Sequence, residues 1–340
     1  MFKKLLVILF VATLIIGSFS LNVVSKNENN RFNRILRTAH SPIEIIGNDD
    51  FNSQNGVTSG AGTKENPYII ENLRIKYTLR DLLKGFNGIS IKNTTAYFVI
   101  KNCYCSFIDG RISYYIFSKL LNAVSCGINL HNVSNGGVEN CILKGLHQAI
   151  NIENNSRNNY VFNCKSIGCF CGIGVNRLST CNIVDNCHTF NYGCGICLWE
   201  NVYNNIVCNS SCRRVGFFIH KSYNNTLMDC TSYFCRGNGL LIYENSYNNT
   251  VKESHFYSNK IGMTVRDNSN KNIIFHNNFI GNLKQAVDED CNQWDDGVEG
   301  NYWKNYHDVD ENDDLIWDNP RQISGGENQD RYPLVEKFNE

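Results

Sequence analysis

The stretch Gly195-Ile196-Cys197-Leu198 is one copy of a four-residue pattern that recurs through most of the 340-residue chain. Glycine or alanine opens each copy, and hydrophobic residues fill its second and fourth positions. The copies begin at Gly88, Gly127, Ala149, Gly172, Gly195, Gly216, Gly239 and Gly262. After a first interval of 39 residues they are spaced 21 to 23 residues apart. A period of that length is typical of a solenoid, in which each repeat stacks on the one before.

Each copy alternates hydrophobic and other residues with period two, the pattern of a strand with one buried face. A second hydrophobic position follows eleven or twelve residues later, at Ile100, Val138, Val161, Val184, Val207, Leu227, Val251 and Ile274. No proline occurs from Tyr68 to Asn319, as expected where strands are hydrogen-bonded on both sides. The repeats lack the Leu-x-x-Leu-x-Leu pattern and the helical half of a leucine-rich repeat. The sequence therefore predicts an all-β fold, a single-stranded parallel β-helix (a solenoid) with a cap at each end.

The N-terminal segment has the pattern of an export signal. Lys3 and Lys4 precede a hydrophobic run that starts at Leu5. Residues 1–24 suit either a cleaved signal peptide or an uncleaved N-terminal membrane anchor, and both interpretations stay open. Either one predicts an N-terminal apolar helix and an exported protein, secreted or held at the extracellular face of the membrane.

The rest of the chain divides by composition. We expect a polar spacer at 25–40, an N-terminal cap with the first coil at 41–87, the repeats at 88–285, and a Trp- and Asp-rich C-terminal cap at 286–340. The first repeat interval is longer than the others. Its surplus around residues 111–121 forms either a loop that bulges from one coil or an extra or partial coil, and we favour the coil because the segment contains apolar and aromatic residues that need cover.

The composition excludes two classes of protein. Lys plus Arg and Asp plus Glu both number 32, so the chain lacks the basic excess of a nucleic-acid-binding protein. Hydrophobic residues make up 42% and charged residues 19%, which is too apolar and too weakly charged for a disordered chain. We therefore expect a folded protein with no nucleic-acid partner.

Nine of the 16 cysteines fall into three columns of the repeat. The columns are Cys103, Cys141, Cys164 and Cys187, then Cys126, Cys171 and Cys194, and then Cys212 and Cys235. Stacked buried thiols are one interpretation, because free cysteine packs as a small hydrophobic side chain. Disulfides between neighbouring coils, Cys171–Cys194 and Cys212–Cys235, are the other, because stacked Cα atoms lie within disulfide range and export permits oxidation. No pair of cysteines flanks a histidine at zinc-finger spacing, so we do not expect zinc.

One face of the predicted sheet carries a stripe of aromatic and charged side chains. It lies four residues after each glycine, a position that points outward, at His131, Glu153, Asn176, Trp199, His220, Tyr243 and Arg266. Such a stripe suits stacking on sugar rings with hydrogen bonds to hydroxyls, although an ordinary solvated face is the simpler interpretation. The next column, Arg177, Glu200, Lys221, Glu244 and Asp267, predicts ion pairs between neighbouring coils.

No catalytic residues can be assigned from the sequence. Glycoside hydrolysis needs two carboxylates close together, and the candidates Glu153 and Asp185 fall on different positions of the repeat. A lyase needs a basic proton abstractor, for which His220 and Arg266 are available, but no acidic cluster stands near them in the repeat register. The chain also lacks a nucleophile elbow, a P-loop and a dinucleotide fingerprint.

The C-terminal segment contains a candidate calcium loop. Its residues Asp310, Asn312, Asp314 and Asp318 have the one-three-five-nine spacing of such a loop. Leu315 stands where glycine is expected and Arg321 where an acid is expected, so a solvated acidic turn is the alternative.

Three segments together resemble a known family. They are the entry segment (Ile46–Phe51, Gly60–Thr63 and Asn66–Glu71), the repeat, and the closing segment (Asn292–Asp296, Gly300–Trp303, Asp310–Asp318 and Asp330–Leu334). In these the chain is similar to archaeal right-handed parallel β-helix proteins of the NosD type, named for a periplasmic copper-related protein, within a wider group of carbohydrate-binding proteins and sugar hydrolases. The resemblance implies right-handed coiling and an extracytoplasmic setting, and it supplies no catalytic residue, because the β-helix is a scaffold with many uses.

Three functions follow as hypotheses. The first is a cell-surface, non-enzymatic module, either structural or binding an extracellular glycan or surface protein through the stripe from His131 to Arg266. The second is a polysaccharide lyase or glycoside hydrolase acting on the same face. The third is extracytoplasmic copper handling, against which stand only 3 Met and 8 His that do not cluster.

Overall fold

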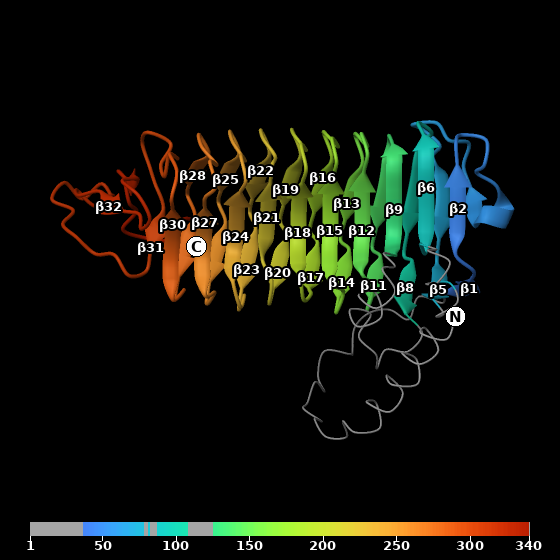
Figure 1. The fold of residues 1–340 in the computed structure, drawn as a ribbon, viewed down its shortest axis with the longest axis horizontal. Coiled ribbons are helices and arrows are strands. Elements are labelled where there is room, and N and C mark those ends of the chain that lie inside the picture. The colour runs from blue at the N-terminus through green and yellow to red at the C-terminus, as the bar shows by residue number, and fades with distance from the viewer. Residues whose placement is uncertain (1–36, 78–80, 82–86, 108–124, 340) are drawn as a thin grey trace, which may run out of the picture. The chain divides into compact units, whose positions relative to one another are not determined.

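The computed structural model describes residues 37–77, 81, 87–107 and 125–339. In these residues the fold is all-β, and the one helical element is a single 3-10 turn at Ser53–Asn55. The strands wind into successive coils that form three long sheets, with like strands side by side along the stack (Figure 1). The predicted parallel β-helix is therefore confirmed.

Sheet 1 contains the repeated four-residue pattern. Its ten strands are parallel and follow the order of the coils. They are β2 (Ile43–Ile46), β6 (Ile89–Thr94), β9 (Cys126–Val133), β12 (Gln148–Glu153), β15 (Cys171–Asn176), β18 (Cys194–Trp199), β21 (Phe217–His220), β24 (Asn238–Tyr243), β27 (Ile261–Val265) and β30 (Lys284–Asp288).

Sheet 2 contains the second hydrophobic position of each repeat. Its strands are β3 (Val57–Ser59), β4 (Tyr68–Glu71), β7 (Phe98–Lys101), β10 (Gly136–Glu139), β13 (Tyr160–Phe162), β16 (Ile183–Asp185), β19 (Ile206–Cys208), β22 (Thr226–Met228), β25 (Thr250–Lys252) and β28 (Ile273–Phe275). All pairs in it are parallel except β3 with β4, which are antiparallel.

Sheet 3 completes each coil. Its strands are β1 (Thr38–His40), β5 (Leu73–Tyr77), β8 (Tyr104–Phe107), β11 (Ile142–Lys144), β14 (Lys165–Ile167), β17 (His188–Phe190), β20 (Ser211–Arg213), β23 (Thr231–Tyr233), β26 (His255–Tyr257), β29 (Asn278–Ile280) and β31 (Tyr302–Trp303). A short antiparallel pair, β32 (Arg321–Gln322) and β33 (Gln329–Asp330), lies in the C-terminal cap.

The register brings like residues together from coil to coil. In sheet 1, Ile150 pairs with Ile173 and Ile173 with Ile196. In sheet 2, Val161 pairs with Val184 and Val184 with Val207. These side chains are buried, so the predicted hydrophobic columns form the core of the coils.

The repeated glycines stack along one edge of sheet 1 because the next coil leaves no room for a side chain. A Cβ atom built on Gly172 or Gly216 would collide with the carbonyl oxygen of Gly195 or Gly239 in the following coil. A Cβ on Gly127 would lie 2.6 Å from the carbonyl oxygen of Ala149. Glycine at Gly127, Gly172 and Gly216 is thus required by the close approach of the neighbouring backbone, although one copy opens with Ala149.

Buried asparagines form a ladder at the corner before sheet 2. The backbone N–H of Asn182 donates to Oδ1 of Asn205 at 2.9 Å, and the N–H of Asn205 donates to Oδ1 of Asn225 at 3.0 Å. The same pattern continues to Asn272, whose N–H donates to Oδ1 of Asn292. Asn292 in turn donates its N–H to Oδ1 of Asn328 in the C-terminal cap, at 3.3 Å. The asparagine-rich corners therefore satisfy buried backbone groups between coils.

The cysteines are free thiols throughout the part of the chain that the structure describes. In the first cysteine column the N–H of Cys141 donates to the sulfur of Cys164 at 3.4 Å. The predicted column of Cys212 and Cys235 is wrong, because Cys212 pairs in register with Ser232. The neighbouring coils differ in length, and the difference moves Cys235 to another position, where its N–H donates to Oδ1 of Asn259.

Two expected boundaries also change. Thr38–His40 already forms strand β1, paired with β5, so the coils begin inside the segment predicted as a spacer. Strand β6 pairs directly with β9, Ile89 opposite Ile128, so the surplus of the first interval supplies no strand between them in sheet 1. The expected extra coil is therefore wrong for this sheet, while residues 108–124 lie outside the described residues.

The predicted N-terminal apolar helix, whether signal or anchor, lies outside the residues that the structure describes, which begin at Arg37. Within those residues the structure contains no helix long and apolar enough to cross a membrane.

The C-terminal cap covers the last coil with aromatic rings. Trp303 stacks on Phe279 with ring centroids 4.3 Å apart, and Trp294 lies 5.8 Å from Trp303. Buried Asp330 accepts hydrogen bonds from Trp303 Nε1 at 2.7 Å and from the N–H of Asn301 at 2.8 Å. The open end of the hydrophobic core is thus closed by indole rings whose N–H groups are satisfied.

Candidate functional site

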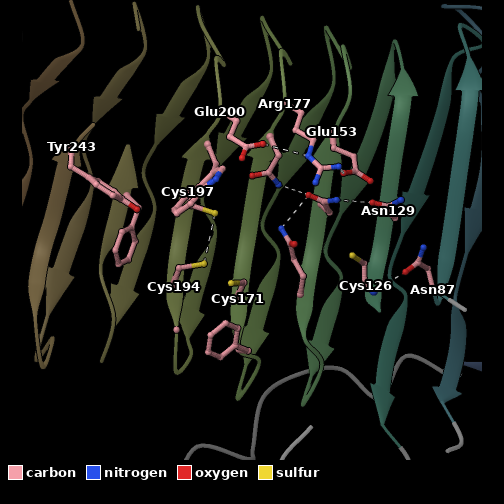
Figure 2. Close-up of a pocket in the computed structure, with 17 residues that line it drawn as sticks. Asn87, Cys126, Asn129, Glu153, Cys171, Arg177, Cys194, Cys197, Glu200 and Tyr243 are labelled. Atoms are coloured by element: carbon pink, nitrogen blue, oxygen red, sulfur yellow. Dashed lines mark hydrogen bonds and ion pairs between the residues drawn. The ribbon is translucent and has the colours of Figure 1, made fainter. Parts of the chain in front are cut away.

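A cavity of about 650 Å³ lies on the outer face of sheet 1. Side chains of β9, β12, β15 and β18 form most of its wall, as Figure 2 shows. The side chains that point inward from these strands, such as Ile173 and Val175, are buried in the core, so the cavity is built from the alternate, outward positions.

A local irregularity adds one more outward position to these strands. The register passes from Cys171–Cys194 to Ile173–Ile196, and Gly195 between them faces the core beside Cys212. Because the glycine turns inward, the cysteine before it turns outward, toward the cavity. Each coil therefore presents three outward positions on this face.

The three outward positions form columns with different chemistry. The first holds Cys126, Gln148, Cys171 and Cys194, the middle one Asn129, Asn151, Gly174 and Cys197, and the last His131, Glu153, Asn176 and Trp199. We call the side of the cavity at Cys126, Cys171, Cys194 and Cys197 the thiol edge. We call the side at Glu153, Arg177 and Glu200 the polar edge.

On the polar edge a guanidinium lies between two carboxylates. Arg177 Nη1 is 3.6 Å from Glu153 Oε2, and Arg177 Nε is 3.5 Å from Glu200 Oε2. His131 Nδ1 lies 3.3 Å from the other oxygen of Glu153. The Glu153 side chain is only 17% exposed, and its two carboxylate oxygens contact His131 and Arg177. The carboxylate is therefore held in place from both sides.

Amide side chains form the floor between the two edges. Asn151 Nδ2 donates to Asn129 Oδ1 at 2.9 Å, and Asn151 Oδ1 accepts from Gln148 Nε2 at 3.2 Å and from Asn176. Gly174 leaves this space open, because a Cβ there would collide with the amides of Gln148 and Asn176. The result is a row of fixed hydrogen-bond donors and acceptors.

The thiol edge is less polar. Cys194 donates to the sulfur of Cys197 at 3.7 Å, and Figure 2 shows both sulfurs at the cavity beside Cys171. A hydrogen bond with Cys194, and then burial, raises the pKa of Cys171, and burial raises the pKa of Cys126. These thiols are therefore protonated. Among the described residues no three or more His, Cys, Asp or Glu side chains are arranged to hold a metal ion.

The predicted binding stripe divides into two parts. Glu153, Asn176, Trp199 and Tyr243 line the cavity, and His131 supports Glu153. His220 is instead buried, with its ring between Trp199 at 3.9 Å and Tyr243 at 4.7 Å.

Arg266 does not line the cavity, and its Nε lies 3.5 Å from Asp267. Sequence reasoning treated Arg177 and Glu200 only as an ion pair and did not single out Asn129, Asn151, Gln148 or Cys197 for this site. For Asn129, Asn151 and Cys197 the signal was present, because each is the third residue of a repeated pattern, a position that also points outward.

The candidate calcium loop closes on itself through hydrogen bonds. Asp310 accepts from the N–H of Asp314 at 3.2 Å and from that of Leu315 at 3.1 Å, and Asn312 donates to Asp314. Asp318 accepts from the N–H of Glu311 at 3.1 Å. Leu315 has φ of 68°, so it adopts the left-handed conformation that glycine normally supplies in such a loop. Calcium binding there stays a prediction.

Comparison with solved structures finds several similar chains. The periplasmic alginate epimerase AlgG is 13% identical with a TM-score of 0.44, covering 73% of this chain and 74% of that one. The mannuronan C-5 epimerase AlgE4 A-module of Azotobacter vinelandii is 10% identical with a TM-score of 0.48, covering 66% and 61%. The catalytic domain of a GH87 alpha-1,3-glucanase is 10% identical with a TM-score of 0.43, covering 78% and 55%. All three TM-scores lie below 0.5, so no property of these proteins is transferred to this chain.

Comparison with curated proteins gives no match. The family described as "Periplasmic copper-binding protein (NosD)" matches residues 110–308, more than half of the chain. The match spans the coils from β9 onward, every cavity-lining residue except Asn87, and the start of the C-terminal cap. This chain therefore belongs to the NosD family.

Proposed function

We propose that this protein binds glycans in the cavity on sheet 1 without cleaving them. The observation that carries the proposal is the division of the cavity into a polar edge and a thiol edge, with amides between them. A sugar ring has apolar faces and a rim of hydroxyl groups, so its two kinds of surface match the two edges. The periodic coils would let a linear glycan cross successive strands.

The amide floor of the cavity supports this proposal because its side chains are fixed before a ligand binds. Asn129 and Asn151 are each 6% exposed, and hydrogen bonds join their amides. An amide both donates and accepts, as a hydroxyl does. A site that needs little reordering loses less free energy on binding.

The carboxylates favour binding over hydrolysis. A glycoside hydrolase keeps one of its two carboxyl groups protonated to act as general acid. Here one guanidinium, that of Arg177, contacts both Glu153 and Glu200, at 3.6 and 3.5 Å, so the two carboxylates belong to one ion-pair group. The lyase and hydrolase alternatives therefore rank second.

The setting that we propose is outside the cytoplasm, with residues 1–24 as the export signal or the membrane anchor. The periplasmic description of the NosD family agrees with export. Mass spectrometry of the mature N-terminus distinguishes a secreted protein from an anchored one.

The test is a glycan array followed by calorimetry on each hit. We expect Trp199→Ala and Asn151→Ala to weaken binding at least tenfold, because both side chains line the cavity. Tyr247→Ala is the matched control, since Tyr247 is a 40% exposed aromatic residue outside the cavity. Equal affinity of all variants would overturn the proposal. New reducing ends or unsaturated products from any hit would show an enzyme instead.

Copper binding is a second candidate, favoured by one observation. The sulfurs of Cys194 and Cys197 lie 3.7 Å apart at the cavity, and thiolates select Cu(I). Binding there must displace protons from the thiols, so affinity should rise with pH.

Anaerobic titration with Cu(I) against a competing chelator tests the copper site. The double variant Cys194→Ser with Cys197→Ser should bind one equivalent of Cu(I) less than the wild-type protein. The control is Cys230→Ser, a buried core position where other coils carry Ser210 and Ser254. Equal copper binding by both variants would exclude the site.

A further inference from the structure

We infer that the cavity accepts uncharged glycans and rejects polymers of uronic acids. This inference rests on the proposed glycan binding and specifies the class of ligand. It is carried by the charges on the cavity wall, which are few and lie close together on the polar edge. Figure 2 shows them as a connected group at one side of the cavity.

The wall has a net negative charge. Three charged side chains line it, namely Glu153, Arg177 and Glu200. Two of them are carboxylates, and the single guanidinium contacts both, at 3.6 and 3.5 Å. The guanidinium of Arg177 thus already has two carboxylate partners, which compete with any further carboxylate for it.

Neighbouring cations on this face are also paired. Lys221 Nζ lies 3.1 Å from Glu244, which also contacts His220 at 3.2 Å. Arg266 lies 3.5 Å from Asp267. No cation in the described columns beside the polar edge is left to attract an acidic ligand.

The remaining polar groups of the wall are amides, which suit hydroxyl groups. Asn87, Asn129, Gln148, Asn151 and Asn176 line the cavity and carry no charge. A sugar hydroxyl can donate to Glu153 or Glu200 and accept from an amide. A uronate carboxylate can only accept, and it would meet two carboxylates of like charge. Like-charge contact of this kind is a means of rejecting the wrong partner.

The experiment uses pairs of ligands that differ in one group. Oligosaccharides of glucose with β-1,4, β-1,3 or α-1,4 linkage are each compared with the same oligomer oxidised at C6 to the glucuronate. We expect at least one parent oligomer to bind and its oxidised form to bind at least tenfold more weakly. The difference in affinity between the parent and the oxidised oligomer should decrease as the NaCl concentration is raised, since salt screens charges.

A charge-reversing variant sharpens the test. Glu153→Gln combined with Glu200→Gln changes the formal charge of the wall from −1 to +1, counted over Glu153, Arg177 and Glu200. We expect it to raise affinity for the oxidised oligomer at least tenfold relative to affinity for the parent. Glu244→Gln, an exposed carboxylate that does not line the cavity, is the control and should change neither. Near-ultraviolet circular dichroism verifies that each variant is folded.

The outcomes separate the two proposals. An oxidised oligomer that binds as tightly as its parent, or more tightly, overturns the inference and leaves glycan binding in place. Failure of every oligomer, parent and oxidised, overturns the proposed glycan binding and this inference with it. A tenfold preference for the parent that the double variant abolishes supports both.

Discussion

The repeated coils and the C-terminal cap are stabilised in different ways. In the coils the same contact recurs, as in the buried ladder in which Asn182, Asn205 and Asn225 are joined by hydrogen bonds of 2.9 to 3.0 Å. In the cap each contact occurs once, as in the bonds that Asp330 accepts from Trp303 and Asn301. Damage to a coil should therefore stay local, whereas damage to the cap should expose the end of the core.

The largest effect is expected at Asp330. Asp330→Ala removes a fully buried acceptor from four donors, Trp303 Nε1 at 2.7 Å, Asn301 N at 2.8 Å, Asn301 Nδ2 at 3.3 Å and Tyr332 N at 3.2 Å. We expect the free energy of unfolding to fall by about 3–5 kcal/mol, because buried donors are left unsatisfied. Tryptophan fluorescence during denaturation measures it. Glu311→Ala, at an exposed position in the cap, is the control, and a loss below about 1 kcal/mol for Asp330→Ala would contradict this role.

The second-largest expected effect is a pH dependence of the free energy of unfolding, which arises from Asp330 in the same cap. Burial raises the pKa of Asp330 to about 7. The unfolded chain releases this proton near pH 4, so between about pH 4 and 7 the folded state binds more protons than the unfolded state. Stability should therefore fall as pH rises across this range, by on the order of 2–4 kcal/mol, and then level off. The Asp330→Asn variant should lack this slope, and equal slopes in both proteins would refute the assignment.

A smaller and more local effect is expected in the ladder. Asn205→Ala leaves the N–H of Asn182 without its acceptor and removes the bonds to Ser179 and Tyr203. We expect a loss of about 1–3 kcal/mol, confined to the adjoining coils. Hydrogen exchange resolved by residue measures where protection is lost. Asn204→Gly is the control, because Asn204 has φ of 56°, which glycine adopts freely; exchange that spreads over all coils would show that they unfold together.

The smallest effect is expected at the surface of the first coils. Lys92 pairs with Glu44, and the two side chains are 33% and 48% exposed. Lys92→Ala should cost about 0–1 kcal/mol and less in high salt. Thermal denaturation at two salt concentrations measures this. A loss as large as that of Asn205→Ala would end the distinction between buried and exposed contacts in the coils.

The repeat could be predicted from the sequence because residues of the same type recur at a nearly fixed spacing. Gly172, Gly195 and Gly216 mark the start of each strand, and Val161, Val184 and Val207 mark the next sheet, so register and core followed from spacing. The first cysteine column followed in the same way, and the hydrogen bond from Cys141 to Cys164 confirms it.

The cavity could not be predicted from alternation alone. Strict alternation would place the residue before each glycine inward. The irregularity at Gly195 instead turns Cys194 outward. That irregularity depends on contact with the neighbouring coil, which the alternation of residue types does not reveal. The contact of Arg177 with Glu153 joins two different positions of the repeat, so a column-by-column analysis missed it. Coil lengths also vary, which separated Cys212 from Cys235. The residues that meet at the cavity, and the separation of Cys212 from Cys235, thus depend on turn lengths and side-chain directions, which the spacing of the repeat does not determine.

The asparagine ladder also has a direction. Each backbone N–H donates toward the C-terminal side, from Asn205 to Asn225 and finally from Asn292 to Asn328. A coil that emerges first during synthesis or export therefore keeps an unmatched donor until its successor arrives, and only the last segment of the chain ends this sequence. We therefore expect a chain cut short before Asn328 to present an unfinished edge, available to quality-control proteases or to a second copy.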